Sequence, residues 1–186
     1  MSEMEKFAII LIGLPGSGKT TIAQCLLEHF RCHYFSSDTV RVRLFGNPSI
    51  TEDRDYTKEE IKIVYNALSY IVDIRAQHGE NMMTEGFFRN KKCRDEVCEI
   101  LTQNGYNMYK YHIICDEDIL EERLIRRSMQ VNIATSGVKG YRIARETFEY
   151  PVDSECYITI DNSGELEVSV NEILQSIKNV KTCKSL

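Results

Sequence analysis

The sequence predicts an α/β fold in which a five-stranded, mostly parallel sheet is flanked by helices. Two observations carry this prediction. Strand-like and helix-like segments alternate along the whole chain, which is the order found where parallel strands are joined by crossover helices. A glycine-rich loop directly follows the first apolar segment and opens the first amphipathic segment, as in a strand that leads through a phosphate-binding loop into a helix.

The first part of the chain supplies two strands, each followed by a helix. Residues 7–12 are a continuous apolar run, which is typical of a buried parallel strand. Residues 19–30 carry apolar side chains at helical spacing. Residues 32–35 are a short second strand, and a serine or aspartate can cap the helix expected at 37–45. The polar segment 47–56 is expected to be a loop.

The middle of the chain continues the alternation. Residues 57–60, Thr-Lys-Glu-Glu, form a capping box that opens a long amphipathic helix ending near residue 78. Residues 81–84 are the third strand, although their composition is only weakly apolar. Asn90 can cap the next helix, which stops at an Asn-Gly step. Residues 106–115 are the fourth strand.

The last part of the chain completes the pattern. A charged helix is expected at 116–128, a polar loop at 129–138, and a further helix at 139–149 that ends at a Tyr-Pro step. Residues 156–160 are the fifth strand, and residues 166–180 are the final helix.

Length and composition restrict the class of protein. The 186 residues suit a single domain, 1–186, with a full hydrophobic core. The net charge of −5 disfavours a broad nucleic-acid-binding surface but allows a local basic site. No apolar stretch is long enough to cross a membrane, and the acidic start MSEMEK does not resemble a signal peptide, so a cytoplasmic location is expected. The seven cysteines form no C-x-x-C pair and are expected to be reduced thiols.

The loop after the first strand matches G-x-x-x-x-G-K-[ST], a nucleotide-phosphate motif. Backbone N–H groups must wrap the phosphates closely, which requires turns that only glycine takes without strain. The positive end of the following helix points at the anion. Lys19 can then reach the β- and γ-phosphates, and the Thr20 hydroxyl can bind Mg²⁺. The expected nucleotide-binding residues are Gly13, Pro15, Gly16, Ser17, Gly18, Lys19, Thr20 and Thr21.

The second strand leads to a further candidate. Ligands of parallel sheets bind at the carboxyl ends of the strands, and Asp38 follows such an end, with Arg41 three residues later on the same helix face. A phosphoryl acceptor needs a carboxylate to take its hydroxyl proton, and an anionic substrate needs a guanidinium. Asp38 could equally be a helix cap with Arg41 as its surface partner. Its position beside the phosphate loop favours a catalytic role.

Later segments offer more charged candidates. Glu85 follows the third strand, where a carboxylate can hold Mg²⁺, often through water, or bind the substrate; the alternative is a solvent-facing turn residue. Arg94 belongs to a basic cluster typical of a solvated helix face, but it could face the cleft and bind substrate. Arg123 and Arg127 are four residues apart and share a helix face, where lid guanidiniums would stabilise charge on a transferring phosphoryl group. Arg126 points elsewhere by helical geometry.

These motifs resemble the small phosphate-loop kinases that include the kinase domain of polynucleotide kinases and the zeta-toxin-like kinases. The motifs are GLPGSGKTT, S-S-D-x-x-R at 36–41, Glu-Gly at 85–86 with an arginine nine residues after the glutamate, R-x-x-x-R at 123–127 and D-N-S at 161–163. The resemblance covers nearly the whole chain. It implies a P-loop NTPase fold of the nucleoside-kinase-like type, with the phosphate-loop strand central and a helical lid over about residues 116–150.

The resemblance also implies cofactors and roles. ATP and Mg²⁺ would be the cofactors. By this resemblance Lys19 and Thr20 would bind ATP·Mg²⁺, and Asp38 would be the general base. Arg41 would orient the acceptor, and Arg123 and Arg127 would belong to the lid. The related kinases usually carry Asp where this chain has Glu85. The substrate signatures of shikimate, gluconate and adenylate kinases are not seen in this sequence.

Three hypotheses for the function follow. The first is an ATP-dependent phosphotransferase that moves the γ-phosphoryl group of ATP to a hydroxyl of a small molecule, with no membrane partner. The second is a polynucleotide 5′-hydroxyl kinase whose basic channel would contain Arg41, Arg94 and residues 123–145; the acidic net charge disfavours it. The third is a non-catalytic, regulatory ATP-binding module.

Overall fold

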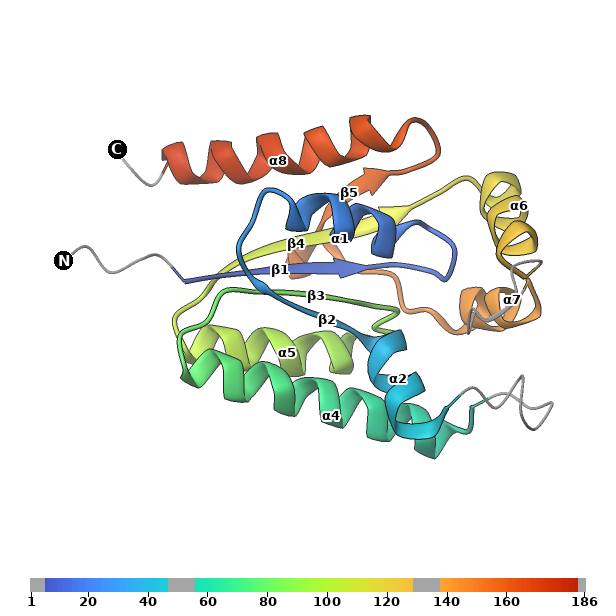
Figure 1. Ribbon diagram of the computed structural model, residues 1–186, viewed down its shortest axis with the longest axis horizontal. Coiled ribbons are helices and arrows are strands. Elements are labelled where there is room, and N and C mark those ends of the chain that lie inside the picture. Colours follow the sequence, from blue (N-terminus) through green and yellow to red (C-terminus); the bar gives the residue numbers. More distant parts are fainter. Residues whose placement is uncertain (1–5, 47–55, 129–137, 184–186) are drawn as a thin grey trace.

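Five parallel strands form the centre of the protein (Figure 1). The structure is a computed structural model that describes residues 6–46, 56–128 and 138–183. The strands are β1 (Phe7–Ile12), β2 (His33–Ser36), β3 (Met82–Gly86), β4 (Asn107–Ile114) and β5 (Ile158–Asp161). Their order in the sheet is β2-β3-β1-β4-β5, which places the phosphate-loop strand in the middle and confirms the predicted sheet.

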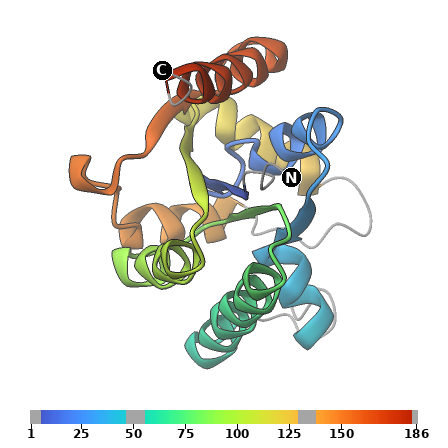
Figure 2. The ribbon, with the colours of Figure 1, turned by 90° about the vertical axis from the view of Figure 1, so that its left-hand side faces the viewer.

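Helices cover both faces of this sheet and the carboxyl ends of its strands. They are α1 (Lys19–Leu27), α2 (Ser37–Phe45), α4 (Lys58–Gln77), α5 (Lys91–Gln103), α6 (Glu117–Ser128), α7 (Val138–Thr147) and α8 (Leu166–Cys183). Figure 2 shows α8 and α4 on opposite sides of the strands; α1 packs beside α8, and α5 beside α4. The helices α6 and α7 lie beyond the carboxyl ends of the strands, where the helical lid is expected (Figure 1).

The hydrophobic core explains why β1 reads as an unbroken apolar run. Ala8, Ile10 and Ile12 face the core cluster under α4 and α5, while Ile9 and Leu11 face the cluster under α1 and α8. All five side chains are buried. A strand covered on both faces has no solvent side, so its sequence does not alternate.

Several predicted boundaries shift. The strand β3 continues through Glu85, so the prediction that the strand stops at residue 84 is wrong by two residues. The strand β5 starts later than residue 156, because a 3-10 helix (Asp153–Glu155) precedes it and Cys156 adopts a left-handed backbone with φ 54°. The helix α1 ends at Leu27 rather than at residue 30. The loops predicted at 47–56 and 129–138 lie, apart from their last residues, outside the described part of the chain.

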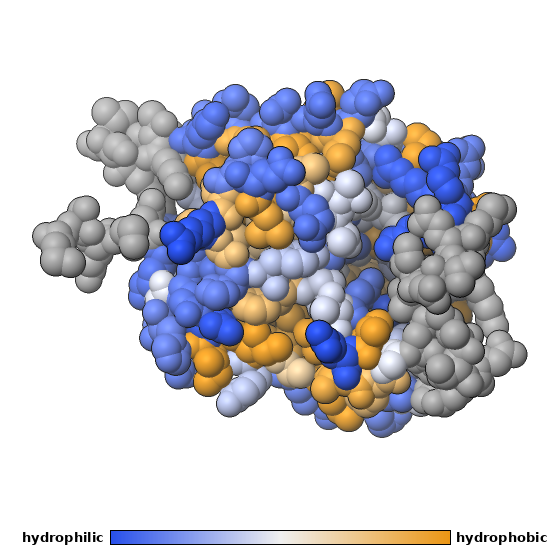
Figure 3. Space-filling model, in the orientation of Figure 1, coloured by the Kyte–Doolittle hydropathy of each residue, from blue (hydrophilic) through white to orange (hydrophobic). Residues whose placement is uncertain are grey.

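On the face drawn in Figure 3, hydrophobic residues are interrupted by hydrophilic ones. Within the described ranges, every helix is either too short or too polar to cross a bilayer.

Candidate active site

A cleft of about 760 Å³ opens at the carboxyl ends of the central strands. Its wall is built by the phosphate loop, the start of α1, α2, the start of α4, the segment after β3, α6, α7 and the segment after β5. The predicted site residues on this wall are Pro15, Gly16, Gly18, Lys19, Thr20, Thr21, Asp38, Arg41, Glu85, Arg123 and Arg127. Eleven residues from four separate segments of the sequence therefore meet in one cleft.

Two glycines are required by the shape of the phosphate loop. Gly18 caps α1 with φ 94°, and a Cβ there would lie 2.1 Å from Nδ2 of Asn162. Gly13 has φ 146°, and a Cβ there would lie 2.3 Å from the carbonyl oxygen of Ile113. Gly13 and the buried Ser17 are loop residues that are not on the cleft wall. Gly13 therefore shapes the loop without lining the cleft, whereas Gly18 does both.

The side chain of Lys19 bonds to the backbone of the phosphate loop. Its Nζ donates a hydrogen bond to the carbonyl oxygen of Leu14 at 2.9 Å, and the residue is only 8% exposed. Burial lowers the pKa of Lys19, while the carboxylates of Glu85 and Asp38 act in the opposite direction. The lysine therefore lies between the phosphate loop and the two acidic groups of the cleft.

Glu85 is joined directly to the phosphate-loop threonine. The Oγ1 of Thr20 donates to Oε1 of Glu85 at 2.8 Å, and Glu85 is 3% exposed, so the alternative of a solvent-facing turn residue is wrong. A hydroxyl and a carboxylate are hard oxygen donors of the kind that Mg²⁺ prefers. Within the described ranges no cluster of three His, Cys, Asp or Glu could hold a metal alone. These two residues thus suit an ion that takes its other ligands from phosphate and water.

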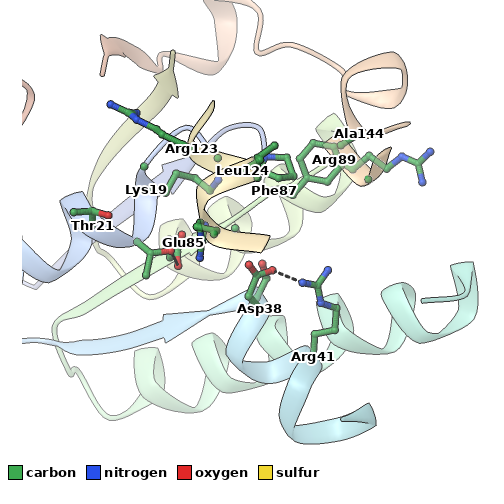
Figure 4. Close-up of a pocket in the computed structure, with 18 of the residues that line it drawn as sticks. Lys19, Thr21, Asp38, Arg41, Glu85, Phe87, Arg89, Arg123, Leu124 and Ala144 are labelled. Atoms are coloured by element: carbon green, nitrogen blue, oxygen red, sulfur yellow. Dashed lines mark hydrogen bonds and ion pairs between the residues drawn. The ribbon is translucent and has the colours of Figure 1, made fainter. Parts of the chain in front are cut away.

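Asp38 and Arg41 form an ion pair at the opposite wall. Arg41 Nη2 lies 2.9 Å from Asp38 Oδ1 (Figure 4). The Arg41 guanidinium lies over the ring of Tyr56, 4.5 Å from its centroid. Ser36 is the cap of α2, and Asp38 lies inside its first turn, so the capping alternative for Asp38 is wrong. The Asp38 side chain is 62% exposed and reaches into the cleft (Figure 4). It is positioned to contact a bound molecule.

Positive charge dominates the cleft wall. Of the described lining residues, seven are Lys or Arg and only two are Asp or Glu. The cations are Lys19, Arg41, Lys58, Arg89, Arg123, Arg126 and Arg127. Such an excess within a chain of net charge −5 is strongly localised and attracts anionic ligands.

One of these cations contradicts the sequence prediction. Arg126 was expected to point away from the site, but it lines the cleft together with Arg123 and Arg127. The helix α6 lies beyond the strand ends instead of packing on the sheet, so more than one of its faces borders the cleft. Arg123 is further held by a 3.3 Å contact from its Nη1 to Sγ of Cys115 at the base of α6.

The prediction that Arg94 binds substrate is wrong. Arg94 is 2% exposed, and its guanidinium donates two hydrogen bonds to the carboxylate of Glu155, at 2.6 and 2.9 Å. Its Nη1 donates to the carbonyl oxygens of Phe88 and Glu149. It does not line the cleft. Arg94 therefore fastens α5 to the segment before β5.

Asn162 is a site residue to which the sequence assigned no role. It is 3% exposed, and its Nδ2 donates to the carbonyl oxygen of Ser17 at 2.9 Å. Ser169 Oγ donates to Oδ1 of the same side chain at 3.1 Å, which fixes the amide orientation. Asn162 therefore ties the phosphate loop to the segment between β5 and α8. The D-N-S motif at 161–163 was the only sequence feature that could have pointed to Asn162. The motif does not define the spacing between this residue and the phosphate loop.

Replacing Asn162 should weaken nucleotide binding. In Asn162→Asp a carboxylate would face the Ser17 carbonyl oxygen in place of an N–H donor, so the loop loses its anchor. We expect the Kd for ATP, measured by calorimetry, to rise about tenfold, which corresponds to one lost hydrogen bond. Ser169→Ala removes only the outer support and should have a smaller effect. Unchanged ATP affinity in Asn162→Asp would refute the anchoring role.

Comparisons with known proteins identify a family and several relatives of this chain. A family profile described as an AAA domain matches residues 9–142. An uncharacterized protein from Mycobacterium tuberculosis is 22% identical over 166 residues, or 86% of this chain. The chain spans only 32% of the length of that relative. A shikimate kinase from Bartonella quintana is 21% identical over 183 residues, covering 96% of this chain and 82% of the kinase.

Solved structures resemble the whole fold. A sugar kinase from Janibacter superposes with a TM-score of 0.74 at 18% identity, covering 93% of this chain and 95% of the other. A gluconokinase from Sinorhizobium meliloti gives a TM-score of 0.71 at 16% identity, covering 94% and 93%. At such identities the likeness establishes the fold and not the substrate. The predicted α/β P-loop NTPase fold is confirmed, and the chain belongs to the AAA-domain family whose profile spans its phosphate loop, central strands and α6.

Proposed function

We propose that the protein is an ATP-dependent phosphotransferase that moves the γ-phosphoryl group of ATP to a hydroxyl group of a small molecule. The carrying observation is that the phosphate loop and the Asp38 carboxylate border one cleft whose wall is rich in arginine. The names of the relatives, sugar kinase, gluconokinase and shikimate kinase, support a small acceptor. The narrower resemblance to polynucleotide and zeta-toxin-like kinases stays a prediction.

The chemistry follows from the positions of the cleft residues. The loop amides and Lys19 hold the phosphates of ATP, and Thr20 with Glu85 would hold Mg²⁺, which neutralises charge on the β- and γ-phosphates. Asp38 accepts the proton of the acceptor hydroxyl as that oxygen attacks phosphorus. Guanidiniums of α6 stabilise the charge on the transferring group. The rate gain comes from positioning and charge rather than from a covalent intermediate.

The charged residues on the cleft wall around Asp38 support a particular kind of acceptor, and this part of the cleft is the proposed acceptor end. Arg41, Lys58 and Arg89 line it, and Asp38 is the carboxylate among them. In the described ranges neither Lys58 nor Arg89 is part of an ion pair, and the buried Nε of Arg41 has no hydrogen-bond partner. A neutral acceptor would leave these donors unmatched. We therefore propose an acceptor that carries a carboxylate or phosphate group besides its hydroxyl.

A paired panel of acceptors tests the proposal. Hydroxy acids and sugar phosphates are compared with their neutral amide or dephosphorylated counterparts, and ADP formation is followed. We expect turnover with acidic members, and we expect Arg89→Gln to raise the acceptor KM about tenfold without changing the KM for ATP. Lys92→Gln, on the exposed side of α5, is the matched control. Equal turnover of neutral counterparts, with no effect of Arg89→Gln, would contradict this acceptor class.

Two other functions give different results in the same assay. A polynucleotide 5′-kinase would use an oligonucleotide acceptor and lose activity steeply with added salt. Burial of Arg94 removes one residue from the basic channel that this function would need. A regulatory module would bind ATP without forming ADP with any acceptor.

A further inference from the structure

The environment of Glu85 contains a second donor that the proposed mechanism does not use. The hydroxyl of Tyr34 donates to Oε1 of Glu85 at 2.8 Å, the same oxygen that accepts from Thr20 at 2.8 Å. Tyr34 lies on β2, in the strand pair that places Ser36 beside Glu85. The two donors reach Glu85 from different elements, one from β2 and one from α1. They meet at one carboxylate oxygen on the wall of the cleft.

We propose that Tyr34 is a positioning residue that holds Glu85 in the orientation needed at the metal and phosphate site, an inference that rests on the proposed function. Glutamate has a long, flexible side chain, so fixing its carboxylate costs conformational entropy. Two hydrogen bonds to Oε1 define that orientation and occupy both acceptor sites of this oxygen. The other oxygen, Oε2, would then be the one left to face a metal ion.

The chemistry of this contact supports the role. The Tyr34 hydroxyl is the donor, and the Glu85 side chain is the acceptor. A hydrogen bond to an ionised carboxylate is stronger than one between neutral groups, which suits a fixed support.

A purely structural role for Tyr34 has a different consequence. The ring also packs against the core cluster under α1 and α8, and phenylalanine would fill that space equally well. Only the hydroxyl distinguishes the two roles. Tyr34→Phe removes the hydroxyl and keeps the ring, so its effect on metal binding separates a positioning residue from a packing residue.

The experiment measures metal and nucleotide binding instead of turnover. A non-hydrolysable ATP analogue is titrated in EDTA by calorimetry, and Mn²⁺ binding to the protein–analogue complex is measured by electron paramagnetic resonance. We expect Tyr34→Phe to leave the metal-free affinity unchanged and to raise the Kd for Mn²⁺ about tenfold, as outer-shell changes at metal sites do. Tyr111→Phe is the matched control, since this buried tyrosine bonds Ser176 on α8, away from the cleft.

A double-mutant cycle supplies the second variant. Aspartate at position 85 is one methylene shorter, so Glu85→Asp should already lose the Tyr34 contact. Tyr34→Phe should then add no further loss in the Glu85→Asp background. The inference is overturned if Tyr34→Phe leaves the Mn²⁺ affinity at the wild-type value, or if it has the same effect in both backgrounds. Wild-type protein that binds the analogue without any metal dependence would overturn the proposed function and this inference together.

Discussion

Asp38→Asn should lower the rate of phosphoryl transfer by about 10²-fold or more while leaving the affinity for ATP unchanged. Asparagine keeps the shape of the side chain but cannot take a proton from the acceptor hydroxyl. Asp38 reaches the cleft from α2, opposite the phosphate loop, so its replacement does not disturb the nucleotide contacts. Single-turnover transfer and calorimetric ATP binding measure the two quantities separately.

The ion pair with Arg41 requires its own control. Because Arg41 Nη2 bonds Asp38 at 2.9 Å, Asp38→Asn also weakens this pair. Arg41→Gln breaks the pair and keeps the carboxylate, so it should raise the acceptor KM more than it lowers the transfer rate. Asp73→Asn, on the outer side of α4, should have no effect. Transfer by Asp38→Asn at the wild-type rate would show that Asp38 is not the general base.

Arg94→Met should lower the free energy of unfolding by about 3–5 kcal/mol, the usual cost of removing one partner from a buried ion pair. The Glu155 carboxylate, 7% exposed, would lose both of its hydrogen bonds from the guanidinium. The carbonyl oxygens of Phe88 and Glu149 would also lose a donor. Urea denaturation of the two proteins measures the difference.

Two further variants show whether the loss of stability in Arg94→Met comes from the broken ion pair or from changed packing. Arg94→Met/Glu155→Leu removes both charges and should recover much of the stability. Lys91→Met breaks only the exposed pair with Asp95 and should shift the urea midpoint little. Arg94 holds the pKa of Glu155 below its ordinary value, so the stabilisation is present above that value and is lost as pH falls. A wild-type urea midpoint for Arg94→Met would refute this account.

Local patterns in the sequence were sufficient for the fold and for the core of the site. The phosphate loop is a contiguous motif, and Asp38 with Arg41 follows from a strand end and helical spacing, so neither needs long-range information. Apolar runs placed the strands for the same reason. Only the predicted ends of helices and strands differ from the observed ones, by about one to three residues. Such boundaries depend on single turns, such as the 3-10 helix before β5.

The residues whose positions the sequence analysis mispredicted, or whose roles it missed, all depend on contacts between distant parts of the chain. The partner that buries Arg94 is 61 residues away, and the carbonyl that Asn162 binds is 145 residues away. The hydrogen bond from Tyr34 to Glu85 joins two strands 51 residues apart. The place of Arg126 depends on how α6 lies relative to the strand ends. Spacing along one helix or strand contains none of this information.

Transfer of the γ-phosphoryl group is the central claim, and one measurement tests it most directly. The protein is mixed with γ-labelled ATP and the panel of acidic hydroxyl compounds under single-turnover conditions. We predict that the label leaves ATP and appears in an acid-stable phosphoester, with ADP formed in equal amount. Asp38→Asn should form the phosphoester and ADP much more slowly than the wild-type protein. ATP that stays bound and intact, or label released only as inorganic phosphate with every acceptor, would contradict it.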